Sequence, residues 1–195
     1  MMREGEMIMT KKEAIKKLTD YMKVHNLGYH LSMDGGCPLL TTAYRVENAP
    51  GYCVESCIWF YGETAEARVY YSAVGAEVCR KSGCREGLLR LLNFINARVF
   101  LSCGDGCGTL YGTHMLYTPR IYMTEDDCYD ITITTMIPYD FWEIAPIETA
   151  DYLTAYCPEL LDRLTCDIFG VLVGKITAEE AIRSVEREIL GMKDE

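Results

Sequence analysis

The sequence has no long apolar run, few histidines and no recognisable catalytic motif. No apolar segment approaches the roughly 18 residues that a membrane-spanning helix requires, so we expect no membrane insertion. Among 195 residues there are only three histidines, His25, His30 and His114. No Gly-Lys-Ser/Thr phosphate loop and no zinc-ligand spacing occur. We therefore expect no catalytic residues, no metal and no cofactor.

Positive charge is also scarce. The chain has 19 lysines and arginines against 29 aspartates and glutamates, which gives a formal net charge of −10. An acidic protein repels phosphate backbones and forgoes the counterion release that drives most nucleic-acid binding. Nucleic acid is therefore not an expected partner.

Hydrophobic residues make up 49% of the chain and aromatic residues 11%, which predicts a folded globular protein. The length suits one core, and no linker or internal repeat divides it. We expect a disordered segment at residues 1–9 and a single domain at residues 10–191. The N-terminal residues lack the apolar core and cleavage site of a secretion signal, so the predicted location is cytoplasmic.

Ten cysteines are present, and in a reducing compartment they should remain thiols. Cys53 and Cys57 lie in a predicted strand, where four residues place them roughly 13 Å apart, too far to share a metal ion. The segments 79–84 and 103–107 lack the two-residue spacing of zinc knuckles and redox motifs. The cysteines therefore predict no metal site.

The first half of the chain predicts a helix followed by four strands. A capping box at Thr10 and Glu13 begins the helix, and Gly28 ends it. Short, turn-rich connections join the strands, which favours antiparallel pairing. The predicted strands are residues 29–33, 39–46, 52–61 and 67–72. In the third, Val54, Ile58 and Phe60 share one face, with Trp59 and Tyr61 on the other.

The second half predicts a helix capped by Ser82, then strands at residues 115–123 and 129–137. Residues 146–190 predict three helices separated by turns, with Pro158 in the first turn of the middle one and a capping box at Thr177. This order, roughly αββββαββααα, predicts an α+β fold with an antiparallel sheet and helices on one face.

Two polar segments invite a chemical interpretation. Gly104, Gly106 and Gly108 could cradle an anion, but no helix follows them, which favours a flexible connection. The acidic residues 125–130 lack the alternating ligands of a calcium loop and are typical of a solvated turn. A cysteine beside a histidine would give a thiol-dependent enzyme or small-molecule site, and this remains the alternative hypothesis.

Aromatic residues are more numerous than one core of this size needs, with 14 tyrosines and two tryptophans. Several lie on the strand faces opposite the apolar ones and have arginines nearby. Such side chains are typical of protein interfaces, although they could equally cover a sheet face packed by loops or the C-terminal tail. The candidate partner-binding residues are Trp59, Tyr61, Arg68, Tyr70, Arg120 and Tyr122.

The element order over residues 10–190 is similar to that of type III secretion chaperones and the related YbjN-like bacterial proteins. Residues 92–96 (LNFIN), 119–122 (PRIY) and 130–133 (DITI), with the long helical end, resemble the latter. The resemblance implies a small α+β domain, often dimeric, that binds other polypeptides and has no catalytic centre. The extra first hairpin, the cysteine content and the divided helical tail differ from a secretion chaperone.

The leading hypothesis is therefore a cytoplasmic, non-enzymatic α+β module. It is expected to bind a protein partner, or itself as a homodimer, through a face or an edge of its sheet.

Overall fold

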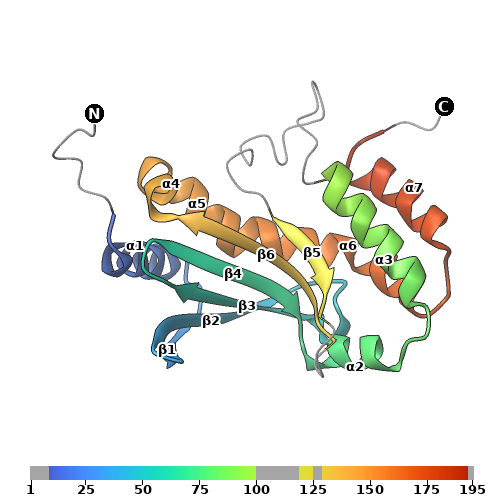
Figure 1. The fold of residues 1–195 in the computed structure, drawn as a ribbon, viewed down its shortest axis with the longest axis horizontal. Coiled ribbons are helices and arrows are strands. Elements are labelled where there is room, and N and C mark those ends of the chain that lie inside the picture. Colours follow the sequence, from blue (N-terminus) through green and yellow to red (C-terminus); the bar gives the residue numbers. More distant parts are fainter. Residues whose placement is uncertain (1–8, 100–118, 125–128, 193–195) are drawn as a thin grey trace.

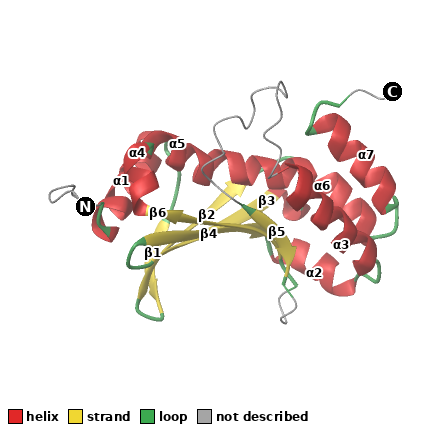
Figure 2. Ribbon diagram, turned by 45° about the horizontal axis from the view of Figure 1, so that its top comes forward, coloured by secondary structure: helices red, strands yellow, loops and turns green. Residues whose placement is uncertain are grey.

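An antiparallel sheet of six strands forms the scaffold of the protein (Figure 1). The coordinates are a computed structural model in which residues 9–99, 119–124 and 129–192 are described. Helices pack on one side of the sheet, which confirms the predicted α+β class (Figure 2). No helix in these ranges is long and apolar enough to cross a membrane.

The strand order in the sheet is β1-β2-β3-β4-β6-β5, and every neighbouring pair is antiparallel. A two-residue turn joins β1 to β2, and Gly35 and Gly36 both have positive φ there, at 54° and 84°. The strands are β1 (His30–Asp34), β2 (Cys37–Arg45), β3 (Cys53–Phe60), β4 (Thr64–Tyr71), β5 (Arg120–Met123) and β6 (Ile131–Pro138).

Both predicted capping boxes are confirmed, at Thr10 before α1 and at Thr177 before α7. In each, the threonine hydroxyl accepts from the backbone N–H of a glutamate, and that glutamate's carboxylate accepts from the threonine N–H. The helices are α1 (Lys11–Val24), α2 (Ala73–Lys81), α3 (Arg85–Phe94), α4 (Tyr139–Ile144), α5 (Pro146–Asp151), α6 (Cys157–Leu172) and α7 (Ala178–Glu188).

The helical prediction differs from the structure in several details. Ser82 does not cap the start of α3 but follows the end of the unpredicted helix α2, and its hydroxyl donates to the Leu172 carbonyl of α6. Pro158 lies in the first turn of α6, as predicted, but no turn precedes that helix, because α5 continues into α6 through the π-helical segment Tyr152–Tyr156. The wider π turn accommodates the proline ring just after it. The short helix α4 was also not predicted.

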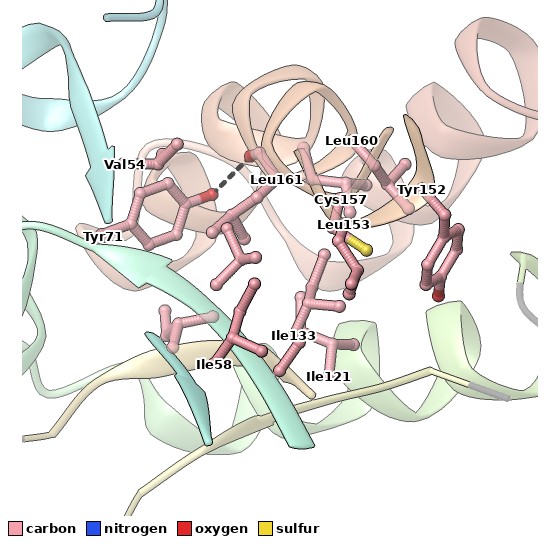
Figure 3. Close-up of a cluster of buried hydrophobic side chains, with 14 of the residues drawn as sticks. Val54, Ile58, Tyr71, Ile121, Ile133, Tyr152, Leu153, Cys157, Leu160 and Leu161 are labelled. Atoms are coloured by element: carbon pink, nitrogen blue, oxygen red, sulfur yellow. Dashed lines mark hydrogen bonds between the residues drawn. The ribbon is translucent and has the colours of Figure 1, made fainter. Parts of the chain in front are cut away.

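The sealed face of the sheet is the side on which the helices pack. Val54, Ile58 and Phe60 of β3 are fully buried there, as the alternation predicted. Helix α6 crosses β3 and β4 and packs its leucines onto these strands (Figure 3). Met9 is also buried, and its N–H donates to Glu143, although residues 1–9 were expected to be disordered.

Polar contacts fix the position of α6 on the sealed face. The Tyr71 hydroxyl donates to the Leu161 carbonyl at 2.8 Å (Figure 3). The Asp162 carboxylate accepts from the backbone N–H groups of Asn48 at 2.8 Å and Ala49 at 2.9 Å. It also accepts from the Glu47 N–H and from the Asn48 side chain. One carboxylate thus ties α6 to the β2–β3 connection.

Replacing Asp162 with alanine should destabilise the protein by roughly 2–4 kcal/mol, because several partly buried N–H donors lose a charged acceptor. Chemical denaturation would measure the free energy of unfolding. Glu159→Ala, which removes an exposed carboxylate from the same helix, is the matched control and should change that free energy little. Equal effects of the two substitutions would show that Asp162 does not anchor the helix.

Candidate functional site

The open face is the side of the sheet that points away from the helices, and it contains all six predicted interface residues. Figure 2 shows α1, α4, α5 and α6 on the other side. Up to residue 192, where the description ends, the C-terminal helices do not cover the open face, because α7 packs against α3 and α6. The open face includes Thr41, Glu55, Cys57, Trp59, Tyr61, Glu66, Arg68, Tyr70, Arg120, Tyr122, Thr132, Thr134 and Met136.

Strand pairing arranges the predicted residues in two rows across the sheet. Arg68 of β4 and Arg120 of β5 are both paired with Thr134 of β6, so one strand separates them. Tyr70 and Tyr122 are both paired with Thr132 in the same way. Two strand spacings place the members of each row about 10 Å apart.

The pairing of β4 with β6 creates these rows, and β6 is more than fifty residues further along the chain. Residue types in the sequence indicated that these side chains share a face. They could not indicate which of them are neighbours, because that depends on long-range strand order.

A cluster of linked polar contacts surrounds Trp59. Its indole N–H donates to Asp34 at 2.8 Å, and the Arg68 guanidinium lies 5.1 Å from the centre of its ring. Glu66 accepts from the Arg68 Nε at 2.7 Å and from the Tyr61 hydroxyl at 3.1 Å. We call Asp34, Trp59, Tyr61, Glu66 and Arg68 the Trp59 cluster.

The contacts in the Trp59 cluster are partly exposed, so each contributes little to stability. Their main effect is to hold a large aromatic ring and a guanidinium group in fixed positions at the surface. Sequence reasoning missed Asp34 and Glu66. Glu66 could have been found from its position two residues before Arg68, on the same strand face.

An open depression of about 580 Å³ lies on the open face beside Tyr70. Its lining includes Tyr29, Thr41, Ala43, Glu55 and Tyr70. The Tyr70 hydroxyl lies 3.3 Å from the Cys57 sulfur. Burial is the main cause that raises the pKa of Tyr70, and the contact with Cys57 is the second. The phenol therefore stays neutral and offers a hydrogen bond. The lining of the depression therefore combines several hydroxyl groups, the Glu55 carboxylate and the small apolar side chain of Ala43.

Four of the described thiols, those of Cys53, Cys57, Cys79 and Cys157, are poorly suited to nucleophilic chemistry. Burial raises the pKa of Cys53 and of Cys57, which lowers the thiolate fraction at neutral pH. His25 stacks on Tyr21 with ring centres 4.2 Å apart, and His30 lies in β1, two strands from Cys57. In the described ranges no group of three or more histidine, cysteine or acidic side chains could hold a metal ion.

Several sequence predictions lie outside the described residues. They are the glycines 104–108, the cysteine segment 103–107, the acidic turn 125–127 and His114.

Alkylation with iodoacetamide at pH 7 should be slower for Cys53 and Cys57 in the folded protein than in the chain unfolded by guanidinium, because their raised pKa disfavours the thiolate. Cys157 and Cys79 should be slower still, since burial raises their pKa to about 12 and about 11. Peptide mass spectrometry over time gives each rate, with exposed Cys84 as the internal reference. A folded-state rate for Cys57 above its unfolded rate would instead favour a thiol enzyme.

Comparison with known proteins adds no relative. No family model matches the chain, and neither the curated proteins nor the solved structures include a match.

Proposed function

We propose that this protein is a non-enzymatic module that binds another polypeptide through its open face. The observation that carries the proposal is the Trp59 cluster, in which an aromatic ring and a guanidinium are held ready at the surface. Tryptophan, tyrosine and arginine are the residues that most often dominate the energy of protein interfaces.

Prior ordering of these side chains favours binding. Immobilising a flexible side chain on association costs about 0.5–1.5 kcal/mol. Trp59 is already held by Asp34, and Arg68 by Glu66, so much of this cost is met during folding.

The rows on the open face suggest the chemistry of the bound segment. Arg68 and Arg120 place two guanidinium groups in one row of the open face, and Glu66 pairs with the first of them. These groups can donate to an acidic side chain in the partner, and Tyr70 and Tyr122 beside them offer area for apolar side chains. A partner segment with both kinds of residue fits this surface best.

We further propose a cytoplasmic location and a relationship to the YbjN-like and type III secretion chaperone-like proteins. The location is supported by the free thiols of the described cysteines. The relationship is supported by the element order, and it implies the same polypeptide-binding function.

Replacing Trp59 and Tyr61 with serine should weaken partner binding at least about tenfold while the protein stays folded, because the cluster loses its two aromatic rings. A tagged chain would first capture partners from extracts of the native cell. Calorimetry with the purified partner would then compare the dissociation constants of the wild type and the variant.

The matched control is Ile144→Ser with Ile147→Ser, which removes two exposed apolar side chains, 75% and 64% exposed, from α4 and α5. This control should bind as the wild type does. Unchanged binding by a folded Trp59→Ser/Tyr61→Ser variant would refute the proposed surface.

A further inference from the structure

The two edges of the sheet differ in how their backbone groups are satisfied. At the β5 edge, the side-chain amide of Asn96 donates to the Ile121 carbonyl at 2.9 Å, and the Ile121 N–H donates to the Asn96 oxygen, also at 2.9 Å. Asn96 therefore takes the place of a neighbouring strand. Exposed strand edges pair readily with other chains, and native proteins commonly block them in such ways.

The β1 edge has no comparable block in the part of the chain that the structure describes. Strand β1 is the outermost strand of the sheet, and its sequence, HLSMD, contains neither lysine nor proline. Leu31 and Met33 are 46% and 64% exposed, although they point to the same side of the sheet as buried Leu40. An apolar edge of this kind is open to pairing.

The position of Pro38 shows which backbone groups point outward. Met33 of β1 is paired with Pro38 of β2, and proline has no N–H to donate. Met33 and Pro38 are therefore a non-hydrogen-bonded pair, in which both residues direct their backbone groups away from each other. Because the pattern alternates, the N–H and C=O groups of Leu31 and Met33 both point to the free edge.

Strand β1 is complementary to a second copy of itself. When two β1 strands run antiparallel about Ser32, His30 lies opposite the partner's Asp34, and Leu31 lies opposite the partner's Met33. In this register, Leu31 and the partner's Met33 would each donate the backbone N–H to the other's carbonyl oxygen. The His30 imidazole would meet the partner's Asp34 carboxylate on the open face, and apolar side chains would meet on the sealed face.

We propose that two copies of this chain pair through their β1 edges, antiparallel about Ser32, into one continuous sheet. This inference concerns the edge and is independent of whether the open face binds a further polypeptide. Asp34 already accepts from Trp59, so the partner's His30 would come next to the Trp59 cluster. The two open faces would then form one surface.

Sedimentation of the full chain with a reducing agent, over about 1 μM to 1 mM, tests the pairing. The wild type should form a dimer. Met33→Pro should raise its dissociation constant at least about tenfold, because it removes an outward N–H without breaking a bond to β2. Met33→Ala, which keeps the N–H, is the matched control and should dimerise much better than the proline variant.

Two results would overturn this proposal: a wild type that stays monomeric at the highest concentration, or a folded Met33→Pro variant that dimerises like Met33→Ala. If circular dichroism shows that Met33→Pro is unfolded, Leu31→Lys decides. It places a charge at an exposed edge position and should weaken the dimer to a similar degree.

A pair of charge variants tests the register. His30→Asp places like charges opposite each other in its own dimer, and so does the double variant His30→Lys/Asp34→Lys. Each alone should be monomeric, whereas their mixture should form a heterodimer because both cross-strand pairs become opposite in charge. A mixture that associates no better than its components would rule out pairing about Ser32.

Discussion

The contacts that hold α6 on the sheet determine which side of the sheet stays open. Asp162 accepts four N–H groups from the β2–β3 connection, and Tyr71 donates to the α6 backbone from β4. These partners are separated by about ninety residues or more in sequence, so they form only when the domain closes. Once α6 is fixed there, its leucines pack onto the strands and bury one face of the sheet. The opposite face then keeps its aromatic and charged side chains at the surface.

That asymmetry connects the fold to the proposed function. A sheet sealed on one side can present a rigid surface on the other without loss of its core, because strand side chains alternate between the two. The Trp59 cluster lies at the end of this surface nearest β1, the strand that we propose as the dimer edge. The two edges of the sheet therefore differ. Asn96 of the same chain blocks the β5 edge, whereas the β1 edge is available for pairing.

Local sequence patterns predicted much of this architecture. The alternation in β3 identified which side chains are buried, and the capping boxes at Thr10 and Thr177 located two helix starts, because both are short-range effects. Features that depend on distant contacts were missed. Ser82 was misassigned because its hydroxyl bonds to α6. The continuity of α5 with α6 was missed because Pro158 is typical of a helix start, whereas a π-helical segment joins the two helices there. The arginine and tyrosine rows and the role of Asn96 follow from strand order, which no local pattern contains.

The two tryptophans report on opposite sides of the sheet, since Trp142 is fully buried and Trp59 lies on the open face. Acrylamide quenching of the Trp142→Phe and Trp59→Phe variants would therefore measure each face separately in the free protein. The account predicts that Trp59 fluorescence is quenched several-fold more strongly than Trp142 fluorescence. Equal protection of the two residues would mean that the second face is covered as well, and would contradict the claim that it is free to bind a polypeptide.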